Sequence, residues 1–149
     1  MHMKEENRQT VLIVDDSLLI CEQIKAALKE EDISLWEAHS GQEAVEQLKR
    51  CRPDLILLDV VLPDTDGYEL YNHLKDGSPK DSVIIFLTSK SSDEDVVRGF
   101  SMGACDYIKK PFVKKELQSR IHAHLAQKKQ RDDLDRQNRE LRDSMEKLN

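Results

Sequence analysis

Short apolar runs alternate with amphipathic stretches from Thr10 to about Gln127. Runs this short, rich in branched residues, are typical of strands buried on both faces of a sheet. Strands are therefore predicted at 11–14, 33–37, 55–58, 83–87 and 104–108, with 33–37 at an edge because its polarity alternates. Helices are predicted at 18–28 after a Ser17 cap, at 41–50, 68–75 and 93–101, and from 114 onward. Alternation of this kind predicts a doubly wound α/β fold with parallel strands.

Composition narrows the class of protein. The 149 residues carry a net charge of −6, which argues against direct DNA binding by this segment because phosphate contacts need clustered basic residues. No apolar run approaches the length of a membrane span, and no signal-peptide core begins the chain. The three cysteines, Cys21, Cys51 and Cys105, show no metal-ligand spacing. We expect a cytoplasmic protein with reduced, mostly buried thiols.

The chain divides into three parts by composition. Residues 1–9 are predicted to be disordered or tag-derived, and residues 10–127 to form the globular domain. Residues 128–149 lack Gly and Pro and are predicted to be a helical extension. Within it Leu134, Leu141 and Leu148 are seven residues apart, and Asn138 and Met145 follow the first two by four. This spacing favours a dimerising coiled coil with Leu at d positions, and the alternative is a solvated, frayed helix.

Chemically distinctive residues stand at the ends of the predicted strands. Asp15-Asp16 follow the first strand, Asp59 ends the third, Thr88 follows the fourth, and Lys109-Lys110 follow the fifth. In open α/β sheets this edge is where ligands bind. Carboxylates brought together there repel one another unless a cation such as Mg²⁺ binds between them. Asp59 then keeps an oxygen able to attack phosphorus and form an aspartyl phosphate. The bland alternative for Asp15-Asp16 is a helix cap.

Four segments, VLIVDDS, LILLDVVLPDTDGYEL, IIFLTSK and GACDYIKKPF, together resemble the signature blocks of two-component response-regulator receiver domains. They cover about residues 10–127 in the family's order and spacing. The resemblance implies a flavodoxin-like sheet of strand order 2-1-3-4-5. It also implies that Asp59 is the phosphoacceptor, and that Mg²⁺ is bound by Asp15, Asp16, Asp59 and the Val61 backbone carbonyl.

Further roles follow only from the resemblance. Thr88 would bind a phosphoryl oxygen, and Lys110, next to Pro111, would pair with another in preference to Lys109. Tyr107 would be the switch aromatic that moves inward when Thr88 is drawn to the phosphate. Val61 offers no side-chain group to the phosphate, which leaves the rate of hydrolysis open.

Other residues have structural interpretations. Gly67 and Gly103 are expected to serve turns. His122 and His124 are expected to be surface residues, since positions two apart do not share a helix face. Lys114-Lys115 and Lys128-Lys129 are expected to be solvated.

The predicted function is a phosphorylation switch, not a free-standing enzyme. A sensor histidine kinase or phosphotransfer protein would donate to Asp59, and the domain would catalyse much of its own phosphorylation and slow dephosphorylation. The fourth helix, fifth strand and last helix would then rearrange and alter the coil of a homodimer to control an output. The chain resembles the front end of a longer protein. The alternatives are an aspartyl-phosphate phosphohydrolase, which would want a second acid near Asp59, and a flavodoxin-like cofactor binder.

Overall fold

The computed structural model describes residues 8–77, 82–89 and 106–147, so the expected helix at 93–101 and the residues Gly103, Cys105 and Leu148 lie outside the described part. Five parallel strands form one sheet in the order β2-β1-β3-β4-β5. The strands are β1 (Gln9–Val14), β2 (Ile33–Ala38), β3 (Leu55–Asp59), β4 (Val83–Thr88) and β5 (Asp106–Lys109). The flavodoxin-like order is confirmed, and β2 occupies an edge as predicted.

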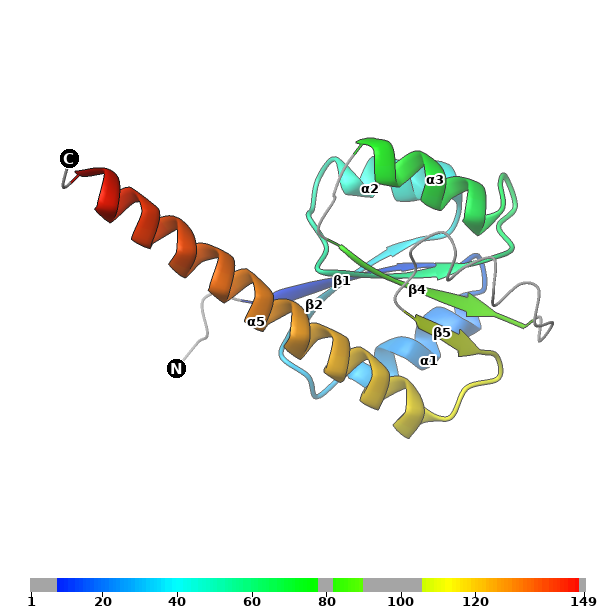
Figure 1. The fold of residues 1–149 in the computed structure, drawn as a ribbon. Coiled ribbons are helices and arrows are strands. Elements are labelled where there is room, and N and C mark those ends of the chain that lie inside the picture. The colour runs from blue at the N-terminus through cyan, green and yellow to red at the C-terminus, as the bar shows by residue number, and fades with distance from the viewer. Residues whose placement is uncertain (1–7, 78–81, 90–105, 148–149) are drawn as a thin grey trace.

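The helices cover both faces of this sheet. Helices α2 (Gly41–Leu48) and α3 (Gly67–Gly77) lie on one face, and α1 (Leu18–Leu28) and α5 (Lys114–Lys147) lie on the other (Figure 1). The predicted cap of α1 is confirmed, because the Ser17 hydroxyl accepts a hydrogen bond from the Ile20 N–H at 3.3 Å. Helix α2 ends at Leu48, two residues before the predicted boundary.

The core follows from the two-residue period of the strands. Val11 and Ile13 of β1 face the α1/α5 side, whereas Leu12 and Val14 face the α2/α3 side. The same division runs through β3, where all five residues are buried. Because both faces are covered, the strands are continuous apolar runs, and the sheet holds its carboxyl edge in a fixed position.

Helix α5 is uninterrupted for 34 residues and extends well beyond the sheet (Figure 1). Its first half packs against the core through Leu117, Ile121 and Leu125, which are spaced four apart. Beyond Lys128 the apolar residues Leu134, Leu141 and Met145 are about 60% exposed. Within the described ranges, none of the helices is both long and apolar enough to cross a membrane.

Two expectations about α5 are wrong. Lys128 is not a solvated charge: it is buried, and its Nζ lies 3.1 Å from Asp54 Oδ1 and 2.6 Å from Asp132 Oδ2. His124 is not a plain surface residue, because it is half-buried with Nε2 at 3.0 Å from Asp106 Oδ2. In both cases an acidic residue distant in sequence supplies the partner.

Candidate functional site

The carboxyl ends of three central strands bring Asp15, Asp59 and Thr88 to one edge of the sheet. The register pairs Val14 with Leu58, so β1 and β3 end side by side. All three residues are buried, with Asp15 fully inaccessible. Lys110 reaches the same edge from the end of β5, where its N–H donates to the Thr88 carbonyl at 2.8 Å. The sheet thus gathers residues separated by up to 95 positions.

Lys110 is the basic residue of this edge. Its Nζ lies 2.7 Å from Asp15 Oδ2 and 3.3 Å from Asp59 Oδ2. Lys109, the other candidate, is exposed. The peptide bond between Lys110 and Pro111 is cis. The geometry therefore favours Lys110 over Lys109 as the cation that faces both carboxylates.

The carboxylates of Asp15, Asp16 and Asp59 have oxygens that all lie within 4.8 Å of one another. Asp15 Oδ2 is buried and accepts no hydrogen bond of good geometry from the described residues. It does form an ion pair with Lys110. Asp16 is exposed, which leaves a side open to water. An all-oxygen donor set with a spare buried lone pair and solvent access fits a hard cation such as Mg²⁺.

Burial and like charge perturb this cluster. Burial, and then the charge of Asp15, raise the pKa of Asp59 to about 6, against the opposing effect of Lys110. Burial alone would lower the pKa of Lys110, but its ion pairs with Asp15 and Asp59 outweigh burial and raise it. Asp15, Asp59 and Lys110 therefore interact as one electrostatic unit, in which two carboxylates face a single ammonium.

The loop after β3 is shaped around Asp59. The Val61 N–H donates to Asp59 Oδ1 at 3.2 Å, which orients the carboxylate. Val61 itself is mostly exposed and forms an isolated bridge with Asp66. Gly67 N–H donates to the Val60 carbonyl at 2.6 Å, and a side chain at Gly67 would collide with the Asp59 carbonyl. Gly67 is thus required by close backbone approach, not by turn geometry alone.

Asp64 is a residue that sequence reasoning missed. Its carboxylate accepts the N–H groups of Gly41 and Gln42 at 2.8 and 3.0 Å and so caps α2 from the loop that follows Asp59. These hydrogen bonds lower the pKa of Asp64. A search for caps looks at the residue before the helix, which is Ser40, and Asp64 is more than twenty positions away. Asp64 ties the loop to α2.

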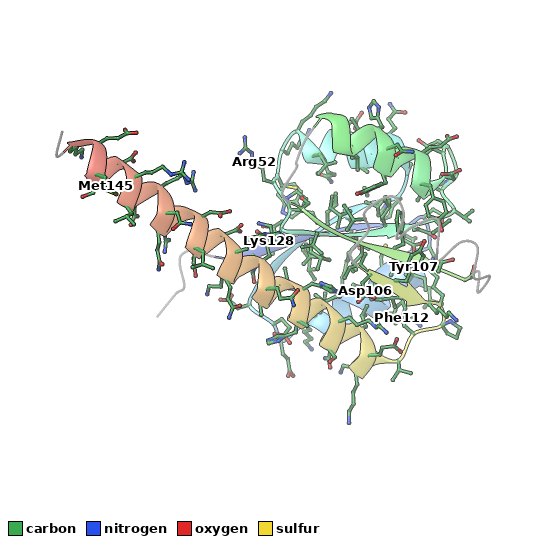
Figure 2. The ribbon with its side chains drawn as sticks, in the orientation of Figure 1. Arg52, Asp106, Tyr107, Phe112, Lys128 and Met145 are labelled. Atoms are coloured by element: carbon green, nitrogen blue, oxygen red, sulfur yellow. The ribbon has the colours of Figure 1, made fainter. Side chains whose placement is uncertain are left out.

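Tyr107 lies on β5 with its ring already buried. Its hydroxyl is 2.9 Å from that of Tyr68 on α3, and both rings pack on Phe86. Figure 2 shows Tyr107 beside Asp106, the preceding residue of β5. The Asp106 carboxylate meets Arg120 of α5 at 2.6 Å. Movement of Tyr107 during switching stays a prediction.

Comparison with known proteins decides the family. The model of the response regulator receiver domain matches residues 11–122. The chain belongs to the response regulator receiver family. It is 43% identical over 117 residues to transcriptional regulatory protein YvrH of Bacillus subtilis, covering 78% of this chain and 48% of that protein.

Two further relatives extend the comparison. A protein of Vibrio cholerae named "Probable cyclic di-GMP phosphodiesterase" is 40% identical over 139 residues, which is 93% of this chain and 31% of that protein. A solved CheY-like response regulator receiver domain protein from Methanospirillum hungatei has a TM-score of 0.77 at 28% identity, over 84% of this chain and 99% of its own.

The chain spans about half, or less, of the length of these curated relatives. Receiver domains are regulatory signalling domains that interact with histidine kinases or phosphotransfer proteins, and they generally bind Mg²⁺ at an acidic pocket.

Proposed function

We propose that this receiver domain is a switch that accepts a phosphoryl group on Asp59. The observation that carries the proposal is the convergence of Asp59, Asp15 and Lys110 at one sheet edge, with Lys110 Nζ 3.3 Å from the Asp59 carboxylate. Phosphoryl transfer needs positioning and charge neutralisation more than elaborate covalent chemistry. An oriented nucleophile with a cation in contact supplies both.

Each residue has a definable part in the transfer. Asp59 Oδ2 attacks the phosphorus of a phosphohistidine on the partner, the P–N bond breaks, and the imidazole leaves and takes up a proton. The Val61 N–H holds Oδ1 through its 3.2 Å hydrogen bond. Lys110 neutralises one phosphoryl oxygen, and the Thr88 hydroxyl donates to another. Asp15, Asp16, Asp59 and the Val61 carbonyl would hold Mg²⁺, which when bound supplies positive charge beside the phosphoryl group.

The proposed output path runs through α5. Asp106, adjacent to Tyr107, pairs with Arg120 and His124 of α5 at 2.6 and 3.0 Å. A phosphoryl group that draws Thr88 and Lys110 together shifts β5, and these pairs carry the shift into α5. The extension at 128–149 would transmit it to a homodimeric coil and then to an output domain or partner. Neither direct DNA binding nor membrane association by this segment is part of the proposal, and a cytoplasmic location remains a prediction.

Incubation with acetyl phosphate and Mg²⁺, followed by intact mass spectrometry, tests the proposal. We expect a single added phosphoryl group that is absent in Asp59→Asn and absent when a chelator replaces Mg²⁺. Asp135→Asn, the same substitution at a site on the extension, is the matched control and should be phosphorylated like wild type. Phosphorylation that persists in Asp59→Asn would overturn the assignment.

The alternative of a phosphohydrolase is tested in the same reaction. Slow release of phosphate at about one equivalent per phosphorylated chain fits a switch. Multiple turnover of phosphomonoesters would instead support the enzyme, but Val60 and Val61 stand where a second acid would be needed.

A further inference from the structure

A second cluster of ligand-type side chains lies one strand away from the acidic edge. Cys21 of α1, Glu37 of β2 and His39, just after β2, have ligand atoms that all lie within 4.8 Å of one another. The cluster is next to Asp15, whose N–H donates to Ala38 at 3.0 Å and whose carbonyl lies 3.6 Å from the Cys21 sulfur. Sequence spacing gave no sign of it, because the three residues come from two different elements.

The cluster forms where the sheet-facing side of α1 meets the end of β2. Glu37 lies on β2 and His39 is the first residue after the strand, and the ligand atoms of both lie close to that of Cys21. Cys21 lies one turn after the Ser17 cap, on the face of α1 that packs against the sheet, and is almost fully buried. The His39 side chain is 37% exposed, so the cluster lies near the surface, although His39 Nε2 itself is buried.

Two polar atoms in the cluster lack a hydrogen-bond partner among the residues that the structure describes. Glu37 Oε1 and His39 Nε2 are both buried and make no hydrogen bond, although Lys25 Nζ lies 2.6 Å from Glu37 Oε1. His39 Nε2 is 3.7 Å from Glu37 Oε2, which is too long for a hydrogen bond. Glu37 Oε1 is therefore neutralised by Lys25, whereas His39 Nε2 has no close partner among the described residues. A buried polar atom without a partner is unfavourable, and a bound cation is one way to satisfy it.

The far side of the imidazole strengthens this interpretation. His39 Nδ1 lies 3.6 Å from Glu43 Oε2, so a small ring rotation would make the hydrogen bond. Metal-binding histidines commonly donate their second ring N–H to a carboxylate, which fixes the ring and raises its basicity. Nε2 is then the nitrogen turned toward Cys21 and Glu37.

We propose that Cys21, Glu37 and His39 bind a borderline-soft divalent cation of the zinc class, with water as the fourth ligand. Cys sulfur, His nitrogen and Glu oxygen are each donors that Zn²⁺ accepts, and open tetrahedral sites combine three protein ligands with a water. The all-oxygen cluster at Asp15, Asp16 and Asp59 favours Mg²⁺ instead, so the two sites differ in selectivity. Binding releases the thiol proton to solvent and moves the Lys25 ammonium off Glu37 toward Glu22, which is already 3.2 Å away.

Cobalt(II) titration under reducing conditions, with saturating Mg²⁺ to occupy the acidic edge, tests this proposal. We expect one equivalent of Co²⁺ to produce the near-ultraviolet absorption of a cobalt–thiolate bond, and Zn²⁺ to displace it. Cys21→Ser should lose the band, whereas Cys51→Ser, which alters a half-buried thiol elsewhere, should keep it. Glu43→Gln should weaken binding by about tenfold, as loss of an outer partner typically does.

Two further variants make the test independent of folding at Cys21. His39→Asn removes a partly exposed ligand and should weaken Co²⁺ binding, whereas Lys25→Met removes the competing ammonium and should strengthen it. Absence of the thiolate band in wild type would overturn the proposal, as would a band that survives Cys21→Ser. Asp59→Asn should retain the band, so the metal-site proposal is tested independently of the phosphoacceptor proposal.

Discussion

At the residue scale, Gly67 shows how the absence of a side chain shapes the site. Its backbone lies against the Asp59 carbonyl and the Val60 Cα, so a Cβ would meet main-chain atoms that cannot rotate away. Gly41 makes a useful contrast, because a Cβ there would meet the side chains of Thr65 and Asp64. Side chains on a loop yield more readily than the backbone of a buried strand end.

We therefore expect Gly67→Ala to destabilise the protein by about 1–3 kcal/mol, the usual cost of overpacking. Because Asp59 must move, phosphorylation by acetyl phosphate should slow as well. Urea unfolding and intact mass measure the two effects. Gly41→Ala is the matched control and should change the free energy of unfolding by less than about 1 kcal/mol. Equal effects of the two substitutions would contradict the backbone argument.

At the scale of single residues, the sequence predicts a role correctly only where the local sequence pattern determines that residue's position. It identified the strand-end residues Asp15, Asp59 and Thr88, because buried apolar runs mark strand ends and parallel strands end at one edge. It did not foresee Asp64, Lys128 or the grouping of Cys21 with His39. Each of these depends on a partner from another element, and one sequence contains no record of which elements meet.

At the element scale, α5 is joined to the sheet by charged contacts as well as by its apolar stripe. Asp106 of β5 meets Arg120 and His124, and one turn further along α5 Lys128 meets Asp54, which precedes β3. Figure 2 labels Asp106 and Lys128. Asp54 also accepts the Thr10 N–H at 2.8 Å. Burial would lower the pKa of Lys128, but its bonds to Asp132 and Asp54 outweigh it and raise the pKa. The ammonium therefore stays charged where the extension leaves the domain.

Lys128→Ala should destabilise the protein by about 1–2 kcal/mol. Breaking a buried ion pair costs about 3–5 kcal/mol, whereas breaking an exposed pair costs less than about 1 kcal/mol. The expected loss lies between these values because Lys128 is buried but its partner Asp132 is 46% exposed. Lys129→Ala, at the adjacent exposed position, should stay within about 0.5 kcal/mol of wild type. Lys128→Met, which keeps the packed stem, should recover part of the loss. Chemical denaturation measures all three, and indistinguishable losses at 128 and 129 would refute the anchoring role.

Element types and order were predictable, whereas element boundaries were less so. The apolar runs gave every strand that the structure describes, and the alternating run correctly indicated the edge strand β2. Strand β5 ends one residue later than predicted, at Lys109, because Lys109 pairs with Thr88 although its side chain is polar and exposed. Polarity marks side-chain burial, but strand pairing is made by the backbone.

At the scale of the whole molecule, the extension of α5 presents an apolar stripe that the described part of this chain does not cover. Leu134 and Leu141 are 59% and 61% exposed on a helix that has already left the sheet (Figure 1). A second copy of the same helix would place these leucines at facing d positions, with Asn138 setting the register. Helix α5 would then connect the end of β5, close to Lys110, with the proposed coil.

Replacing both leucines tests this arrangement in the full chain. Leu134→Gln with Leu141→Gln should weaken the dimer by at least about a hundredfold, because burial of each leucine contributes about 1.5–3 kcal/mol and about 1.4 kcal/mol is tenfold in affinity. The control, Arg136→Gln with Asp143→Asn, changes two f positions of the same heptads and should leave the dimer intact. Light scattering over a concentration series gives the oligomeric state.

Both double variants retain Lys128 and its partners Asp54 and Asp132, so a change in oligomeric state would not come from loss of these ion pairs. A wild-type chain that stays monomeric with and without an acyl phosphate, or a dimer unaffected by the leucine changes, would show that α5 carries the signal without a coil.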